Sequence, residues 1–517
     1  MMKLKNKNIF ALSFILFATA FVSCSEDYLD NVNTDFDHTQ NAAAEFILTD
    51  IETSTAFSVT GGDLSTYASV YVEHETGTHN QLFKAQTRDG EPSKSSTYNN
   101  SWLSVYSNIK NSRIVIDKSE VLDNNLLKGI GEVLLAYNSA ILTDIWGDSP
   151  YSESAALANP TIEHLNPKVD TQESIYASIN SLLDAAITDL QSPNLGKNPA
   201  KQDFIYGGNA SKWLKFAYGL KARYAMRLLG RSSDVDGDLT AAIDYCNKSF
   251  SSADEQAEFD MYSASNLNPL FDFEWSRDGI SASSSLANKL VSRNDPRLAR
   301  VYYDPNSWAH QTIADGTTNF ASINDTEEAQ YVYTYSTYVF AQTAPTQLLS
   351  YHEILFLKAE AQARLDKKIE ALATLKKAVV AGMANSERSI EAASTSPTLA
   401  NYGGLGANAP VISASQTESW FDSDIVPLFN ANPIKEIMIQ KYISQWGASG
   451  ESVEAYNDIR RAKGMGTEYI DLENTGKYPL RFTYGSSDTT ANPNIKTIFG
   501  DGTYVYSNAV WWANGTN

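Results

Sequence analysis

Hydrophobic residues at helical spacing run through most of this chain and constrain its fold more than any other feature. Ile130, Leu134, Tyr137, Ile141 and Ile145 recur at steps of four, three, four and four, which places them on one face of a helix. Comparable patterns predict helices over about 102–116, 175–190, 210–229, 347–365, 367–382, 433–446 and 449–463, and another that begins near residue 238. We therefore expect a mostly α fold.

The predicted helices fall into pairs, which indicates a repeat-like scaffold. Ala359, Ala361 and Ala363 suit close helix crossings, and paired helices of this length are typical of tetratricopeptide-like hairpins. Two segments, about 251–345 and 383–432, interrupt the pairs and are rich in Ser, Asn, Gly, Asp and aromatic residues. Because loops of this length are usually functional, we expect them to form a loop-rich second lobe with a few short strands.

The N-terminus has the organisation of a lipoprotein signal. Lys3, Lys5 and Lys7 precede an apolar run over 9–22, and a small residue stands directly before Cys24. A basic start and an apolar segment of this length are typical of a secretory signal rather than a membrane-spanning helix. Cleavage before Cys24 would leave a cysteine for lipidation. The expected organisation is a signal peptide over 1–23, a lipidated tether over 24–40 and a single domain over 41–517.

Composition narrows the range of partners. The chain has 40 Lys+Arg and 61 Asp+Glu, and without the three signal lysines the balance is 37 − 61 = −24. A surface this acidic argues against binding to nucleic acid or to anionic lipid headgroups. The only cysteines are Cys24 and Cys246. If Cys24 is lipidated, no disulfide can form within the chain, and we interpret Cys246 as a buried structural thiol.

Some polar segments that resemble binding loops are better explained as helix ends. The 147–151 segment (GDSPY) stops a helix, because Gly accepts a left-handed cap and Pro prevents continuation. Asn209 is a suitable N-cap for the helix that follows it. The alternating aspartates of 234–238 resemble a calcium loop, but Tyr245 stands where an EF-hand needs Glu. We interpret this segment as a turn that ends in an N-cap at Asp238.

The sequence contains no motif that marks a catalytic or cofactor site. There is no Gly-x-Ser-x-Gly, phosphate loop or dinucleotide fingerprint, so we expect no cofactor. His74 and His79 are five residues apart, which does not match the i, i+4 pair of a helical zinc site, and we expect no metal. A glycoside hydrolase needs two carboxyl groups at a fixed separation, one of them with a raised pKa. Nothing in the sequence selects such a pair.

Several motifs, taken in order, resemble those of the SusD/RagB family of nutrient-binding outer-membrane lipoproteins. They cover nearly the whole chain after the signal: Cys24-Ser25-Glu26-Asp27-Tyr28-Leu29-Asp30, Asp144-Ile145-Trp146-Gly147-Asp148-Ser149-Pro150-Tyr151, Lys212-Trp213-Leu214-Lys215-Phe216-Ala217, Asn294-Asp295-Pro296-Arg297-Leu298, Tyr351-His352-Glu353 with Ala359-Glu360-Ala361, and Gln440-Lys441-Tyr442 with Arg460-Arg461. Each match alone is weak, but together, in order and behind a lipoprotein signal, they are specific.

The resemblance implies a function that composition does not. It implies a non-catalytic lipoprotein of the outer membrane that binds an oligosaccharide, or sometimes a peptide, and delivers it to a SusC-like TonB-dependent transporter. The helical-repeat side would face the transporter, and the variable loops would face the ligand.

Aromatic residues in polar segments are the best candidates for the ligand site. A sugar ring has an apolar face that aromatic rings cover and a rim of hydroxyls that polar side chains bind. Residues 76–98, 271–308 and 420–421 combine both kinds of side chain. The residues expected to bind the ligand are His79, Asn80, Phe83, Arg88, Trp275, Tyr303, Trp308 and Trp420.

Two other functions remain open from the sequence. One is a surface glycoside hydrolase on the same scaffold. The other is a helical-repeat lipoprotein that binds only a peptide or protein.

Overall fold

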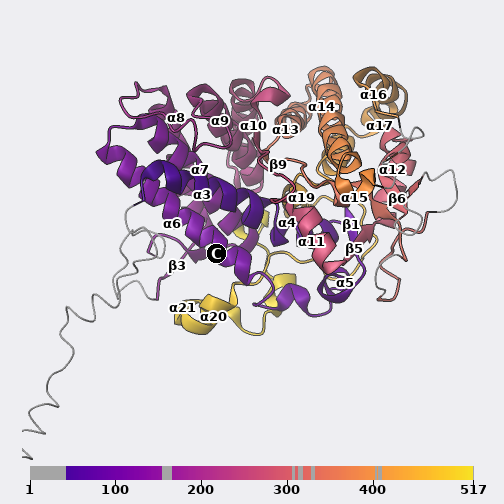
Figure 1. Ribbon diagram of the computed structural model, residues 1–517, viewed down its shortest axis with the longest axis horizontal. Helices are drawn as coiled ribbons and strands as arrows, with labels where there is room; N and C mark the ends of the chain where they lie inside the picture. Colours follow the sequence, from indigo (N-terminus) through magenta and orange to yellow (C-terminus); the bar gives the residue numbers. More distant parts are fainter. Residues whose placement is uncertain are drawn as a thin grey trace, which may run out of the picture. The chain divides into compact units, whose positions relative to one another are not determined.

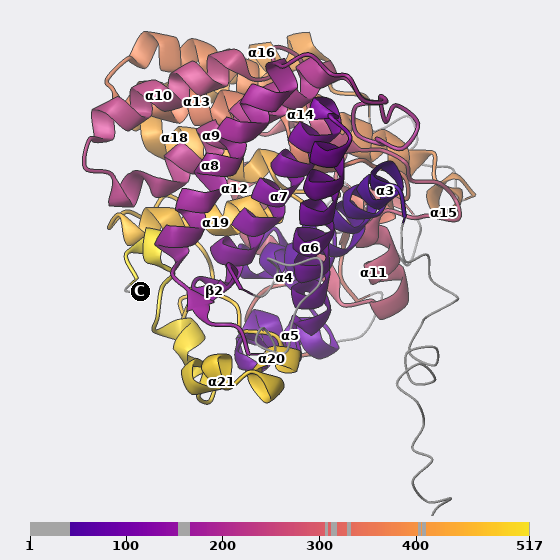
Figure 2. The same ribbon diagram turned by 90° about the vertical axis from the view of Figure 1, so that its left-hand side faces the viewer.

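The computed structural model of this chain describes residues 42–153, 166–304, 309–311, 318–327, 332–401, 405 and 410–515. Figures 1 and 2 show this part as a predominantly helical molecule. By internal contacts the chain divides into residues 1–43 and one compact unit, Ala44–Asn517. Cys24 and Trp308 lie outside the described residues.

A first group of helices, from the N-terminal half of the chain, forms most of the scaffold. Consecutive helices pack against one another, with α6 on α7, α7 on α8, α8 on α9 and α9 on α10. The bounds are α3 Ala44–Ser54, α4 Asp63–Tyr71, α5 Asn80–Thr87, α6 Asn99–Val121, α7 Asn125–Trp146, α8 Gln172–Gln191, α9 Ala210–Arg227 and α10 Val235–Lys248. A π-helix, η1 (Thr55–Thr60), joins α3 to the turn before α4.

The sequence explains where these helices form and stop. All five members of the 130–145 pattern are buried on α7. Asn209 caps α9 by accepting a hydrogen bond from the Lys212 backbone N–H, as predicted. Gly147 ends α7 with φ of +80°, a conformation that favours glycine. The predicted cap at Asp238 is wrong: Asp234 caps α10 four residues earlier, because its carboxylate accepts from the Gly237 N–H.

A second group of helices follows in the C-terminal half. Its bounds are α11 Pro269–Arg277, α12 Ser284–Val291, α13 Tyr351–Arg364, α14 Lys368–Ser394, α15 Pro397–Ala400, α16 Ala414–Trp420, α17 Val426–Ala431, α18 Pro433–Ser444, α19 Ser452–Gly464, α20 Ser486–Ala491 and α21 Pro493–Phe499. The pair α13 and α14 packs closely, with Ala359 and Ala363 buried against α14, whereas Ala361 is buried in the main core. Small residues at a crossing let two helix backbones approach, as the tetratricopeptide-like pattern predicts.

The strands are short and pair in an antiparallel manner. They are β1 Glu75–Gly77, β2 Ser149–Pro150, β3 Val169–Asp170, β4 Ala257–Phe259, β5 Ile280–Ala282, β6 Tyr302–Asp304, β7 Ala309–Gln311, β8 Tyr335–Ser336 and β9 Thr346–Leu349. β1 pairs with β5, β2 with β3 and β4 with β9, and β6 lies between β7 and β8. Five of the nine described strands fall within the predicted loop-rich segment 251–345.

The other predicted loop segment, 383–432, is largely helical. α14 continues to Ser394, and α15, α16 and α17 follow. Buried Met383, Ile390 and Ala393 continue the apolar face of α14 past the point where the sequence pattern was expected to end. The prediction of a loop-rich segment from its polar composition is therefore wrong here, because its few apolar residues still recur at helical spacing.

Candidate functional site

A short strand pair brings together two of the segments in which ligand-binding residues were expected. β1 and β5 are antiparallel, with Glu75 opposite Ala282 and Gly77 opposite Ile280, and the Thr78 N–H donates to the Gly279 carbonyl at 2.9 Å. α5 begins just after β1, and α11 ends just before β5. His79, Asn80 and Phe83 therefore lie at the same end of the ladder as the C-terminal turn of α11, which carries Trp275.

Two residues fix this junction. A Cβ at Gly77 would lie 2.0 Å from the Leu82 carbonyl oxygen, so only glycine lets α5 fold back against β1. The buried Glu274 carboxylate accepts from the Gly279 and Ile280 N–H groups, both at 3.1 Å, and so holds the turn from α11 into β5. Burial, and then repulsion from Asp278, raises the pKa of Glu274 well above its usual range.

Trp275 is the most prominent exposed aromatic residue of the described chain. Its exposed fraction is 64%, while Phe271, one helical turn earlier, is only 3% exposed. The two rings stack at 5.7 Å with an interplanar angle of 12°. Phe271 thus anchors the indole from the core side, and the other face of the indole is open to solvent. A supported, exposed aromatic face is what stacking on a sugar ring requires.

The start of α5, at the same end of the β1–β5 ladder, offers polar groups. The Asn80 backbone N–H donates to Glu327 Oε1 at 2.8 Å, and His79 Nδ1 lies 3.6 Å from the same oxygen. The Asn80 side chain is exposed and Phe83 is half-buried. We call the surface formed by His79, Asn80, Phe83 and Trp275 the Trp275 face.

Three of the expected ligand residues have structural roles. Arg88 Nη1 donates to the Gly476 and Lys477 carbonyls at 2.8 and 2.9 Å, which ties the end of α5 to the C-terminal segment. Tyr303 is fully buried and packs edge-on against Phe340 at 5.4 Å. The Trp420 ring is buried, and its Nε1–H donates to the Arg293 carbonyl at 2.7 Å. Tyr303 and Trp420 are corrections, because buried rings cannot stack on a ligand, whereas a ligand role for the half-buried Arg88 stays a prediction.

A cleft of about 430 Å³ opens beside α11, on a helix face different from the one that carries Trp275. One wall is η1 and the start of α4, and the other wall is α11 with the residues just before it. Its lining includes Phe57, Ser58, Asp63, Asn266, Asp272, Phe273, Ser276 and Arg277. We call it the α4–α11 cleft. The sequence contains a local signal for the start of α11. Asn268 is its N-cap, and Pro269 follows in the first turn.

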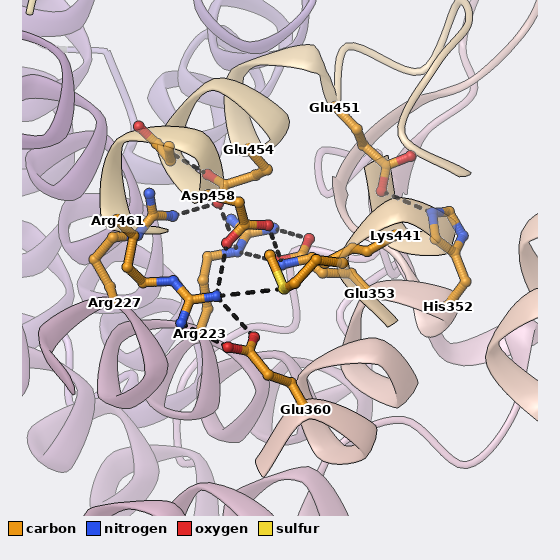
Figure 3. Close-up of polar contacts among 12 residues, drawn as sticks. Arg223, Arg227, His352, Glu353, Glu360, Lys441, Glu451, Glu454, Asp458 and Arg461 are labelled. Atoms are coloured by element: carbon orange, nitrogen blue, oxygen red, sulfur yellow. Dashed lines mark hydrogen bonds and ion pairs between the residues drawn. The ribbon is translucent and has the colours of Figure 1, made fainter. Parts of the chain in front are cut away.

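The interior of the helical scaffold holds a network of buried charges (Figure 3). Arg223 binds Glu353 through two nitrogens at 2.8 and 2.6 Å, and Arg461 binds Glu360 through two nitrogens at 2.8 and 2.7 Å. Arg227 pairs with Glu454, and Lys441 with Asp458 at 2.7 Å. We call these eight residues the core ion network. It joins α9, α13, α18 and α19.

Ion pairing with arginine determines the protonation state of the carboxyl groups in the core ion network. Burial raises the pKa of Glu360, but Arg461 and Arg364 outweigh burial and hold that pKa well below its usual range. For Glu454, Arg227 and Arg223 likewise outweigh burial, and its pKa is lowered. Both carboxylates are ionised and bound to cations; Glu360 is fully buried and the Glu454 side chain is only 12% exposed, so they stabilise the scaffold.

Two carboxyl groups with raised pKa values, Glu75 and Glu274, lie in the core. Burial raises the pKa of Glu75 to about 8, and its Oε1 accepts from Trp446 Nε1 at 2.8 Å. Glu75 and Glu274 are 2% and 6% exposed, so neither can protonate a bound glycan as the acid of a hydrolase must.

The two histidines considered for metal binding are separated in the structure. His74 is fully buried, with Nε2 2.8 Å from the Tyr442 carbonyl and Nδ1 3.0 Å from Ser452 Oγ, whereas His79 faces Glu327. Within the described residues no group of three or more His, Cys, Asp or Glu side chains could hold a metal ion.

The comparisons with known proteins decide the family. A family model described as "Starch-binding associating with outer membrane" matches residues 35–484. The chain belongs to the SusD-like family. A crystal structure of a SusD/RagB family protein from Bacteroides thetaiotaomicron is 46% identical to this SusD-like chain, with a TM-score of 0.87, and the match covers 92% of this chain and 100% of that one.

More distant structures share the fold. A chitin-binding protein is 24% identical, with a TM-score of 0.67 over 92% of this chain and 100% of its own. A SusD homologue from Bacteroides fragilis is 18% identical, with a TM-score of 0.69 over 91% of this chain and 100% of its own. No curated protein matches the sequence. Among the described residues, no helix of this SusD-like chain is both long and apolar enough to cross a membrane.

Proposed function

We propose that this SusD-like protein is a lipoprotein of the cell surface that binds a nutrient glycan without cleaving it and delivers it to a SusC-like TonB-dependent transporter. The observation that carries the proposal is the exposed Trp275 ring, supported from below by Phe271, at the end of the β1–β5 ladder where α5 also begins. The family description, starch-binding and associated with the outer membrane, supports a glycan as the ligand class.

Binding would combine stacking with hydrogen bonds to hydroxyl groups. The indole of Trp275 covers the apolar face of a sugar ring, and the exposed Asn80 amide binds hydroxyls at its rim. Trp308 remains a predicted contributor to the same site.

Substitution of Trp275 tests the site. A glycan array identifies a ligand, and calorimetric titration then compares wild type with Trp275→Ala and Trp308→Ala. We expect Trp275→Ala to weaken binding by about tenfold, because stacking on one aromatic ring contributes about 0.5–1.5 kcal/mol beyond the area it buries. Phe46→Ala, which removes another exposed aromatic ring on α3, is the control and should keep wild-type affinity. Unchanged affinity in both tryptophan variants would refute this placement of the site.

The proposal that no bond is cleaved has its own assay. The protein is incubated with the glycan it binds, and released reducing ends are measured over time. None should accumulate. Release that disappears when one carboxylate is replaced would establish the glycoside hydrolase alternative.

Lipidation at Cys24 would confine the protein to the same surface as its transporter and raise their effective concentration. Cys24→Ser should therefore abolish membrane association and glycan uptake while leaving binding in solution intact. Loss of binding as well would mean that Cys24 has a different role. Trp275→Ala should leave co-purification with the transporter unchanged, since the helical-repeat side is the proposed docking side.

A further inference from the structure

The α4–α11 cleft has the same kind of side chains on both walls. Phe57 and Asp63 line the wall formed by η1 and α4, and Phe273 and Asp272 line the wall formed by α11. Each wall therefore presents one aromatic ring and one carboxylate. A volume of about 430 Å³ lies within the range of small-molecule sites.

The aromatic rings of the cleft are held in place from behind. Phe57 packs edge-on against Phe259 at 5.9 Å and Tyr262 at 5.0 Å, and Phe273 packs against the main hydrophobic core. Both rings are half-buried, so part of each remains available. Rings fixed by packing lose little conformational entropy when a ligand binds.

The charged groups of the cleft have no close partner. Inside the described part of the chain, the side chains of Asp63, Asp272 and Arg277 make no hydrogen bond or close ion pair, although Arg277 acts on Asp63 from a longer distance. Two carboxylates and one guanidinium leave the cleft with an excess of one negative charge. Burial raises the pKa of Asp63, and the positive charge of Arg277 partly opposes this.

A structural explanation accounts for part of this pattern. Asp63 and Asp272 both stand in the first turn of a helix, where a carboxylate interacts favourably with the helix dipole. That explains an acidic residue at each position. It does not explain why both carboxylates line one cleft whose walls also carry two aromatic rings, with Arg277 at its edge.

We propose that the α4–α11 cleft is a second saccharide site, separate from the Trp275 face, and that it takes a sugar ring carrying a protonated amine. The two rings would cover the faces of the sugar, Ser58, Asn266 and Ser276 would bind its hydroxyls, and the two aspartates would bind the ammonium group. This inference rests on the proposed glycan binding and adds to it a ligand charge and a second location.

Two tetrasaccharides with the same backbone test the proposal: β-1,4-linked glucosamine and its N-acetylated counterpart, which lacks the charge. We expect wild type to bind the glucosamine tetramer more tightly, with an affinity that falls as NaCl is added. Asp63→Asn with Asp272→Asn should weaken this binding by about tenfold, and Arg277→Gln should strengthen it by about threefold, because it removes the opposing charge. Binding of the N-acetylated tetramer should change by less than about twofold in these variants.

The outcomes separate this inference from the proposed function. Weaker glucosamine binding in Arg277→Gln, or no change in the double aspartate variant, overturns the inference. The same follows if Trp275→Ala abolishes binding of the glucosamine tetramer while the cleft variants leave it unchanged, although glycan binding at the Trp275 face then stands. If wild type binds neither tetramer but binds another glycan of the array, the inference alone fails. If it binds no glycan, both proposals fail.

Discussion

The core ion network and the α4–α11 cleft use the same residue types in opposite ways. In the network every arginine has a carboxylate partner, as Arg461 and Glu360 show with two contacts at 2.8 and 2.7 Å. In the cleft, Asp63 and Asp272 line the same cavity as Arg277 without pairing with it. Buried charges must be paired because desolvation is costly. Charges at an open cleft can stay unpaired, and they are then available to a ligand.

The comparison also distinguishes charged residues that stabilise the fold from charged residues that would bind a ligand. Breaking a buried pair leaves one charge without a partner in the interior, which is strongly destabilising. Removing an unpaired charge beside solvent leaves no such charge behind. The first kind of substitution should therefore change stability, and the second kind should change affinity with little effect on stability.

The largest effect is expected from Glu360→Gln. This substitution removes the two-contact ionic partner of buried Arg461 and leaves it only Asp458 at 3.1 Å, so it should lower the free energy of unfolding by about 3–5 kcal/mol. Urea denaturation followed by circular dichroism measures it. Glu418→Gln, at an exposed and unpaired position on α16, is the matched control and should change stability by less than about 0.5 kcal/mol. Equal effects of the two variants would contradict the structural role of the network.

A buried carboxyl without a cation partner should make the fold less stable as the pH rises. Glu75 has a pKa of about 8 in the folded chain against 4.5 for the free group, so between these values only the folded state holds the proton. The free energy of unfolding should therefore fall as pH rises from 5.5 to 7.5. One such group accounts for about 2–3 kcal/mol over this window.

Glu75→Gln checks that sign. Denaturation of wild type and variant at both pH values should show a shallower loss in the variant, by about one proton. Glu132, whose pKa burial also raises to about 8, should keep part of the slope in both proteins. A slope unchanged by Glu75→Gln would show that Glu75 is ionised in the fold.

The smallest effect on stability is expected from Asp272→Asn. It removes a first-turn carboxylate from α11 and no ion pair, so the free energy of unfolding should fall by less than about 1 kcal/mol. Thermal unfolding by calorimetry measures it. A loss as large as that of Glu360→Gln would mean that the cleft charges support the fold.

Local patterns predicted the scaffold well and the site only in part. The 130–145 periodicity and the Asn209 cap are properties of neighbouring residues, and the structure has both. Whether an aromatic ring is exposed does not depend on its neighbours in sequence. Trp275 and Trp420 both stand in polar sequence, but Trp275 is exposed and Trp420 is buried. Their difference depends on which distant elements cover them.

The cleft had no signal in the sequence. Asp63 and Asp272 are about two hundred residues apart, and their common cavity arises only because α11 lies against η1 and α4. The core ion network is equally non-local, since it joins α9, α13, α18 and α19.

The most direct test of the central claim, that this SusD-like protein binds a glycan through groups its fold leaves exposed, is the affinity of Trp275→Ala for an array-identified glycan. Calorimetric titration should show binding weakened by about tenfold, with an unfolding temperature within about 1–2 °C of wild type. Wild-type affinity in Trp275→Ala would contradict the account.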